Sequence, residues 1–411
     1  MKDNKCDLIQ LGGNVLFFLL ILVIMLDPTN SVLHLKNVVF ILLVGYNIVF
    51  FKPDFSYLPH LLTIFATIFL CYVLAEMRLI PVDMETLSGV VKGFSPLVLL
   101  LWVKHYNVLR LSIFPVLITC LLVDILYILA SSNDAIQLAL YTFVWQHDDM
   151  IMMSHRYFLG VNVFGMYYKS ILCATFVLLY FFHRTLNRGK HRILFILAAC
   201  IATFSFLISG TRLPMLLPFM LLGIIAFLKI GTMRKAKYLY YPIIAFAILF
   251  FVGFILLLAT EKGEYSNQIK AAHLLSYLEL FNEHPDYLLW GQGPGTAFYS
   301  QGFHRMTYTT EWTYLELLRG YGLFAFLILA VMVWPVFKLY KMRRNRNVAA
   351  MMMAYIVYLV IAGTNPLLIS STGMLIILTI YSYTQRTLAA DLPQKLPSKS
   401  FPKGVYPNSM I

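Results

Sequence analysis

The chain has 411 residues, of which 60% are hydrophobic, 15% are aromatic and only 12% are charged. In a soluble domain about a quarter of the residues are charged, and its core cannot bury an apolar excess of this size. The formal net charge is +13, but the Lys and Arg residues are spread over short connections and the C-terminal tail. The composition therefore excludes an ordinary soluble fold and predicts an all-α polytopic membrane protein with no nucleic-acid partner.

Apolar runs close to the length that crosses a bilayer recur along the chain. The run from Ile193 to Leu228 is too long for one crossing, and we divide it at the polar segment Ser209-Gly210-Thr211-Arg212. This division gives about twelve transmembrane helices, which we expect at residues 11–26, 32–51, 58–76, 88–103, 109–130, 158–182, 192–209, 211–229, 239–259, 313–337, 348–362 and 366–383.

The orientation follows from the loops in which basic residues collect, since such loops stay in the cytoplasm. The strongly basic loops are residues 183–192, 234–237 and 338–346. They alternate correctly with the expected spans and place both termini in the cytoplasm. The first span lacks a small-residue cleavage pattern, so we expect it to be a retained anchor.

One membrane domain is expected over residues 1–385, followed by a disordered cytoplasmic tail at 386–411. Two external loops exceed ordinary connections: residues 131–157, and residues 260–312 between spans 9 and 10. Long loops on a rigid scaffold are often functional, and the second loop is the larger.

Within that larger loop, the apolar spacing from Ile269 to Phe281 predicts an amphipathic helix that lies against the membrane face. His284-Pro285 should end this helix, and Gly291-Gln292-Gly293-Pro294-Gly295 should form a tight turn. A dinucleotide-binding fingerprint is not expected there, because no strand precedes the glycines in a βαβ unit.

Three basic side chains are candidates for binding an anionic group. Arg212 stands at the outer end of a helical hairpin, where its planar fork suits a pair of phosphate oxygens. Lys270 and His273 lie three residues apart and hence on one helical face. Together the three side chains could form a cationic pocket; the alternatives are an interfacial arginine and two solvated helix residues.

The entrance to the span at 313–337 is dense in polar side chains. Glu311 and Tyr314 lie one turn apart, as do Glu316 and Arg319, so the spacing predicts one acid and one ion pair near a shared cavity. Glu311 or His304, in the segment just before the span, could act as the base for an acceptor hydroxyl. A purely structural ion pair is the alternative for Glu316 and Arg319.

The order of these features resembles the Wzy-type O-antigen polymerases and the related O-antigen ligases. Two places carry the resemblance in sequence. One is Ser209-Gly210-Thr211-Arg212, and the other is the stretch from Lys270 through His284-Pro285, Gly291-Gln292-Gly293-Pro294-Gly295 and Tyr314-Leu315-Glu316-Leu317-Leu318 to Tyr321-Gly322.

The resemblance implies a glycosyltransferase that moves a growing glycan from undecaprenyl diphosphate to a hydroxyl of another lipid-linked repeat unit. Arg212, Lys270 and Arg305 would stabilise the departing diphosphate, and Glu311 or His304 would activate the acceptor. The sequence has no recognisable metal-ligand spacing, so we expect a metal-independent reaction without a cofactor. A membrane protein that regulates chain length is a possible partner.

Two alternatives remain at this point. A ligase that joins the glycan to the lipid A core would use the same donor chemistry. The ligase-like pattern has a His just before the Tyr-Leu-Glu helix, whereas this chain has Glu311 there, which favours a polymerase. A flippase or transporter would also suit twelve spans and could use the buried Asp124, which we expect to pair with Lys169 or Arg156.

Overall fold

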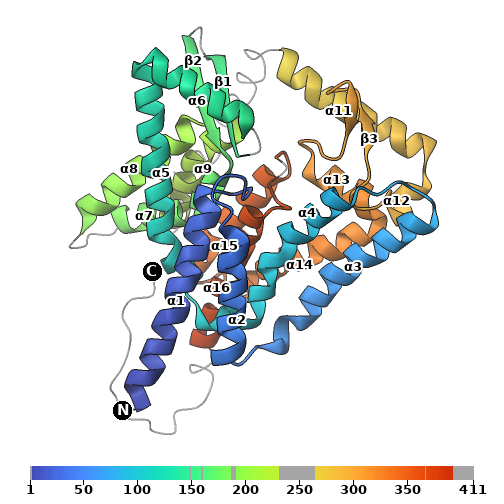
Figure 1. The fold of residues 1–411 in the computed structure, drawn as a ribbon. Helices are drawn as coiled ribbons and strands as arrows, with labels where there is room; N and C mark the ends of the chain where they lie inside the picture. Colours follow the sequence, from blue (N-terminus) through green and yellow to red (C-terminus); the bar gives the residue numbers. More distant parts are fainter. Residues whose placement is uncertain are drawn as a thin grey trace.

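The structure is a computed structural model, and it describes residues 2–147, 150–158, 161–186, 191–230, 264–365 and 367–391. These residues are mostly helical. Figure 1 shows the arrangement. The α-helices are α1 (Lys2–Leu26), α2 (Lys36–Phe50), α3 (Leu58–Met77), α4 (Met84–Phe94), α5 (Val108–Ser132), α6 (Asp134–Gln146), α7 (Ala174–Leu186), α8 (Arg192–Leu207), α9 (Arg212–Ile230), α11 (Glu264–Glu283), α12 (Asp286–Trp290), α13 (Thr313–Tyr321), α14 (Ala325–Lys341), α15 (Arg346–Ala362) and α16 (Ser371–Asp391).

Short 3-10 helices and two small antiparallel hairpins complete the described elements. The 3-10 helices are η1 (Phe55–Tyr57), η2 (Ser95–His105), η3 (Lys169–Cys173) and η5 (Gly322–Phe324). The strands are β1 (Ile151–Phe158) paired with β2 (Val161–Tyr168), and β3 (Phe298–Ser300) paired with β4 (Arg305–Thr307).

Six helical segments of the described chain are long and apolar enough to cross a membrane: Asp7–Leu26, Phe55–Met77, Met84–His105, Val108–Ser132, Arg212–Lys229 and Thr313–Lys341. The shorter helices α2, α8 and α15 are also apolar. The number of twelve spans stays a prediction, and the expected span at 239–259 lies outside the described residues.

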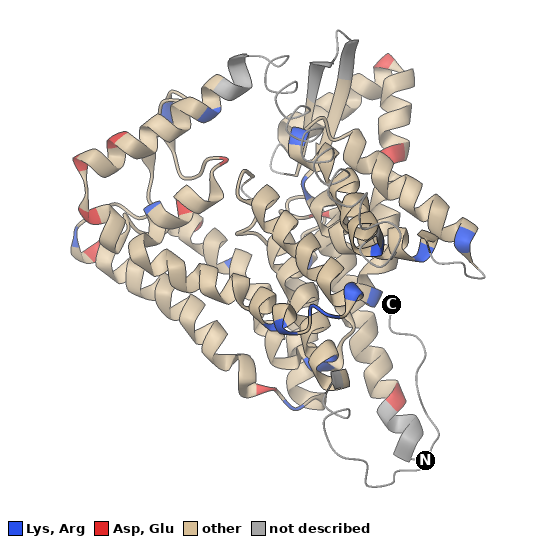
Figure 2. Cartoon of the chain, turned by 180° about the vertical axis from the view of Figure 1, so that it is seen from behind, with Lys and Arg blue, Asp and Glu red and all other residues tan. Residues whose placement is uncertain are grey.

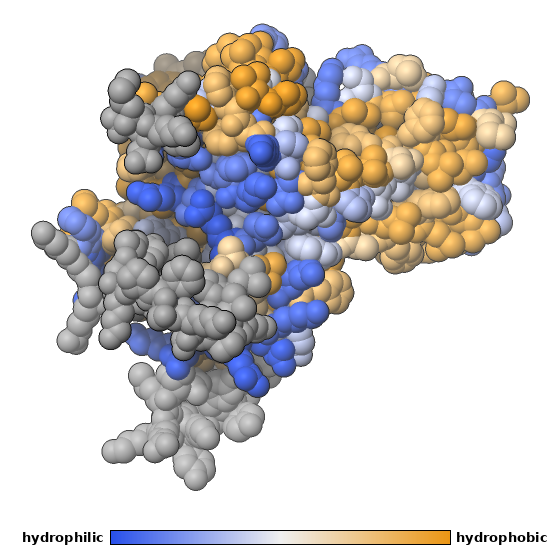
Figure 3. All heavy atoms as spheres, turned by 90° about the horizontal axis from the view of Figure 1, so that it is seen from below, coloured by the Kyte–Doolittle hydropathy of each residue, from blue (hydrophilic) through white to orange (hydrophobic). Residues whose placement is uncertain are grey.

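The surface has the polarity expected of such helices. Figure 2 shows charged residues chiefly at helix ends and in connections, with long uncharged stretches between them. Seen from below, hydrophobic residues cover one flank of the molecule, while hydrophilic residues gather in the middle of that face (Figure 3). Large apolar side chains such as Ile41, Phe69, Phe114 and Phe326 are exposed on this surface, and their contact with lipid would be more favourable than contact with water.

The centre of the bundle is built around α16, which packs against η2, α5 and α14. Ile377 and Tyr381 on this helix are completely buried. Polar groups at the centre include Ser382 on α16, whose hydroxyl donates to the Tyr106 carbonyl at 2.7 Å. A helix buried on nearly every face is typical of the interior of a large helical protein.

The helix expected at residues 158–182 is wrong in its first half. Residues 151–158 and 161–168 form an antiparallel hairpin in which Ile151 pairs with Tyr168, and a helical conformation begins only with η3 at Lys169. The segment 161–168 is rich in Val, Phe and Tyr, which favour strands, and its continuous apolarity does not distinguish a strand from a helix.

Three other boundaries differ from the expected ones. The span expected at 88–103 is α4 followed by η2, and the change to 3-10 geometry falls at Ser95-Pro96, where proline lacks an N–H for the α-helical pattern. The expected loop 131–157 contains α6 and β1. The helix α16 continues to Asp391, so the first residues of the expected disordered tail are helical, and residues 392–411 lie outside the described chain.

The expected helix and turn in the loop 260–312 are present. α11 covers the range Ile269–Phe281 and ends at Glu283, directly before His284-Pro285. Gly291, Gly293 and Gly295 all have positive φ angles. In Figure 1, α11 and β3 lie at the same end of the molecule as α6, β1 and β2, opposite the N-terminus.

Candidate functional site

One face of α11 is anchored to the segments that follow it. His273, Ser276 and Tyr277 are buried, and their spacing of three and four residues puts them on one face of the helix. The Ser276 hydroxyl accepts from the Gln301 N–H at 2.8 Å, next to β3. The face with Leu274 and Leu278 is exposed. The buried face of α11 is therefore held by hydrogen bonds to residues around β3 and α13.

A buried ion pair lies at the base of this arrangement. Arg319 Nη2 and Glu316 Oε2 are 2.8 Å apart, and the two side chains are only 4% and 9% exposed. Glu316 Oε1 accepts from the Thr310 N–H at 2.8 Å and from the Tyr277 hydroxyl. The carboxylate thus joins α11, the segment before α13, and α13 itself. The spacing of the two residues predicted their pairing, and the structure has it.

All five N–H donors of Arg319 are used within the protein. Its Nε and Nη2 donate to Glu316, and Nη2 also donates to the Tyr308 carbonyl at 2.8 Å. Its Nη1 donates to Gln292 Oε1 at 2.6 Å and to Thr296 at 3.0 Å. A guanidinium with no donor left cannot also bind a phosphate. Arg319 therefore holds the loop together and is not an anion site.

The glycine-rich turn is fastened to both neighbouring helices. The Gln292 N–H donates to the Arg319 carbonyl at 2.6 Å, and the Asp83 N–H before α4 donates to the Gly295 carbonyl at 2.9 Å. A Cβ on Gly291 would lie 2.6 Å from the Gly320 carbonyl oxygen, and the φ angle of Gly291 is 74°. Only glycine fits at this position without strain.

Lys270 and Glu311 form a second ion pair, which is open to solvent. Lys270 Nζ is 2.9 Å from Glu311 Oε2, and the side chains are 35% and 38% exposed. The Trp312 indole N–H donates to the Lys270 carbonyl at 3.1 Å, so the two segments are held together beside the pair. The structure thus brings together a predicted diphosphate ligand and a predicted base, residues that are distant in sequence.

The end of strand β2 is hydrogen-bonded to the segment before Arg212. The Met166 N–H donates to the Ile208 carbonyl at 2.8 Å, directly before Ser209. Burial raises the pKa of Tyr167, and the negative charge of Glu311 raises it further, so the next residue of β2 lies within electrostatic range of Glu311. Strand β2 therefore lies beside the segment that leads to Arg212, and the charge of Glu311 acts on the pKa of the neighbouring Tyr167.

Arg212 is the first residue of α9, and its side chain is half-buried. The turn before it is shaped by Gly210, which has a φ of 62°, and by the buried Ser209, whose hydroxyl lies 3.2 Å from the Thr211 hydroxyl. This local structure fixes the position of Arg212 at the N-terminal end of α9. It agrees with the hairpin that the sequence predicts at this point.

The other predicted site residues occupy different surroundings. His273 is completely buried, with Nδ1 2.8 Å from the Ser300 hydroxyl and the Phe303 ring against its imidazole. Burial lowers the pKa of His273, which disfavours the charged form of the ring. The Tyr314 hydroxyl donates to the Leu359 carbonyl at 2.6 Å. His273 and Tyr314 thus act in packing between elements.

His304 and Arg305 lie at the tip of the β3–β4 hairpin and are exposed. His304 adopts a φ of 52°, and the Arg305 guanidinium stacks over the Phe303 ring at 5.7 Å. Both side chains are accessible to a ligand that approaches the outer surface of the hairpin.

Sequence reasoning missed four residues of the buried network: Tyr277, Gln292, Thr296 and Thr310. Tyr277 follows His273 by four residues on α11, and this spacing was an available signal. Gln292 is the one side chain with hydrogen-bonding capacity inside the glycine-rich turn, which also marked it as a candidate. The roles of the two threonines depend on the tertiary fold.

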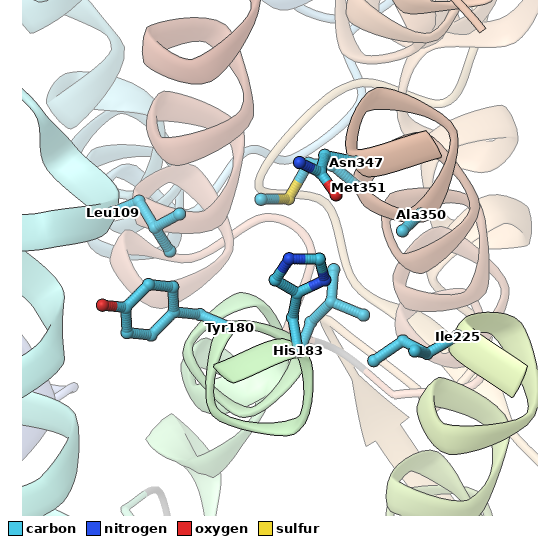
Figure 4. A pocket seen from close by; sticks show the side chains of 8 residues that line it. Leu109, Tyr180, His183, Ile225, Asn347, Ala350 and Met351 are labelled. Atoms are coloured by element: carbon cyan, nitrogen blue, oxygen red, sulfur yellow. The ribbon is translucent and has the colours of Figure 1, made fainter. Parts of the chain in front are cut away.

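A second region that resembles a site is a small cavity of about 20 Å³ lined by α5, α7, α9 and α15, with His183 and Asn347 pointing into it (Figure 4). It has room for about one water molecule. Among the described residues, no three His, Cys, Asp or Glu side chains gather as metal ligands. The buried Asp124 carboxylate, which the sequence suggested for a transporter, accepts a hydrogen bond from the Ser205 hydroxyl at 2.6 Å.

Comparison of the chain with protein-family models, curated proteins and solved structures finds no match.

Proposed function

We propose that this protein is a glycosyltransferase of the bacterial inner membrane that polymerises lipid-linked surface polysaccharide, in the manner of the O-antigen polymerases. The observation that carries the proposal is the solvent-open Lys270–Glu311 pair at 2.9 Å. A cation for a leaving diphosphate and a carboxylate for an acceptor hydroxyl are the two groups that such a transfer requires.

In the proposed reaction, an acceptor hydroxyl oxygen forms a bond to the anomeric carbon of the donor glycan. The bond between that carbon and the undecaprenyl diphosphate oxygen breaks, and the diphosphate leaves with the bonding electrons. Glu311 receives the hydroxyl proton. Arg212, Lys270 and Arg305 stabilise the negative charge that develops on the diphosphate through charge-assisted hydrogen bonds.

The ion pair gives the two groups an order of action. In the structure, Glu311 Oε2 is engaged by Lys270 Nζ at 2.9 Å. A diphosphate that binds Lys270 offers it a stronger anion and releases Glu311 to the acceptor. His304, on the exposed hairpin tip, is the second candidate for the base. Tyr314, Glu316 and Arg319 hold the site in shape through the polar groups that they engage in the fold, and His273 does so through its Nδ1 contact with Ser300.

The test is the glycan ladder on lipopolysaccharide from cells that lack this chain. The cells are complemented with wild type, Arg212→Ala, Lys270→Ala or Glu311→Gln, and with the control Glu283→Gln, an exposed acid at the end of α11. We expect wild type and the control to restore a ladder and the three site variants to leave a single repeat unit. Loss of all attached glycan without the chain would indicate a ligase or flippase instead, and an unchanged ladder would refute the proposal.

A further inference from the structure

A cavity of about 110 Å³ lies where four parts of the chain meet. Its walls come from α4 with Thr86 and Val90, from the glycine-rich turn 293–295, from residues 308–310 together with α13, and from Ile369 before α16. These segments are held in place by the hydrogen bonds from Asp83 to Gly295 and from Gln292 to Arg319. The cavity is therefore a built feature of the fold.

The charged groups of the cavity leave no charge for a ligand. Glu316 and Arg319 line it, but each neutralises the other. The donors of Arg319 are all used, and both oxygens of Glu316 already accept hydrogen bonds. An anion would find no free donor on the guanidinium, and a cation would have to displace Arg319. An uncharged ligand is the one that fits.

The remaining lining combines hydroxyl groups with apolar and aromatic surface. Val90, Pro294 and Ile369 contribute apolar walls, and Thr309 and Tyr308 contribute exposed side chains, the tyrosine being 42% exposed. A sugar ring has this dual character, with polar hydroxyls at its edge and apolar C–H faces. A water needs about 10–15 Å³ of such space, so the cavity holds roughly eight water-sized groups, which suits one sugar ring.

We propose that this cavity binds one uncharged sugar ring of the glycan and places it beside Glu311. Thr309 and Thr310 form part of the wall, and Glu311 is the next residue, with its Cα about 3.8 Å from the Cα of Thr310. A ring held against this wall therefore lies next to the segment that carries Glu311. The assignment of the ring to the acceptor glycan rests on the proposed function, whereas the binding of a sugar ring does not.

Two neighbouring valines on α4 provide a matched pair of variants. Val90 lines the cavity, so Val90→Trp fills it with an indole ring. Val91 is 39% exposed on another face of the helix and is not part of the lining, so Val91→Trp adds the same ring outside. Tyr308→Ala removes one wall of the cavity but keeps the backbone carbonyl that Arg319 uses, which guards against an effect of misfolding.

The experiment is saturation-transfer NMR on the purified full-length protein in detergent. The probes are the methyl glycosides of glucose, galactose, mannose and N-acetylglucosamine, each at millimolar concentration. We expect at least one probe to receive saturation from wild type and from Val91→Trp, with the signal reduced at least fivefold by Val90→Trp and lowered by Tyr308→Ala.

No transfer to any probe from wild type, or equal transfer from wild type and Val90→Trp, would overturn the cavity as a sugar site. The outcome is independent of the glycan ladder. A cavity-dependent NMR signal in a protein whose loss leaves the ladder unchanged would keep the sugar site and refute the polymerase. A failed NMR test in a protein whose loss abolishes the ladder would refute the sugar site and keep the polymerase.

Discussion

Replacement of Arg319 by alanine should destabilise the external loop strongly. The guanidinium is 4% exposed and is hydrogen-bonded to Glu316, Gln292, Thr296 and Tyr308. In Arg319→Ala the Glu316 carboxylate keeps only the Tyr277 and Thr310 donors and becomes an uncompensated buried charge. Removal of one partner of a buried ion pair costs about 3–5 kcal/mol.

The expected loss can be separated from the loss of an ordinary ion pair. Lys104 and Asp54 are 3.9 Å apart, with side chains 38% and 21% exposed, and such an exposed pair contributes about 0–1 kcal/mol. Lys104→Ala is therefore the control for Arg319→Ala. The double variant Glu316→Leu/Arg319→Met removes both charges and should recover much of the lost stability, since it leaves no unpaired ion.

The assay is thermal unfolding of the purified protein in detergent, followed by tryptophan fluorescence, together with limited proteolysis between α11 and α13. We expect Arg319→Ala to lower the unfolding midpoint well beyond the Lys104→Ala value and to make the loop susceptible to protease. If Arg319→Ala and Lys104→Ala lowered the midpoint equally, the reasoning about the buried network would be refuted.

Three further predictions follow from the same region. Charge reversal in the double variant Lys270→Glu/Glu311→Lys should keep the unfolding midpoint near wild type, because the ion pair is retained. It should abolish the glycan ladder, because the cation and the carboxylate have exchanged positions. A normal ladder would contradict the roles of the two residues. Burial lowers the folded-state pKa of His273, against the opposing fields of Glu311 and Glu316, so its stabilising effect is present above the unfolded pKa of about 6.5 and is lost as the pH falls. The unfolding midpoint should therefore fall between pH 7 and pH 5 more steeply in wild type than in His273→Gln, and parallel curves would count against this. Gly291→Ala should destabilise the turn by more than about 1 kcal/mol because its Cβ meets the Gly320 carbonyl, whereas Gly89→Ala, in open space on α4, should stabilise the protein by about 0.5–1 kcal/mol; the midpoints of the two variants test the difference, and equal midpoints would refute the clash.

The long helices were predictable because the hydropathy of a span is a local property of the sequence. The helix α11 and its end before Pro285 were equally local, as was the Glu316–Arg319 pair, which needs only one helical turn. The hairpin of β1 and β2 was not predictable in this way, since an apolar run of Val, Phe and Tyr suits a buried helix as well as a strand.

The candidate site was predictable as a set of residues but not as a set of contacts. The sequence marked Lys270 and Glu311 for separate tasks, and only the tertiary fold brings them to 2.9 Å. It marked His273 as a cation on the basis of its neighbour Lys270, whereas the side chain faces inward toward Ser300. Helical spacing gives the face of a residue relative to its neighbours, but not which face the protein covers.

The fastening of the glycine-rich turn has a consequence for binding. Its backbone is held by hydrogen bonds to the Arg319 carbonyl on one side and from the Asp83 N–H on the other, and Thr296 pairs with Val82 in a bridge. A segment held at these points has little conformational entropy left to lose when a ligand arrives. The conformational entropy that a loop normally loses on binding is here already lost on folding. A weak ligand such as a single sugar ring can therefore be retained by few contacts.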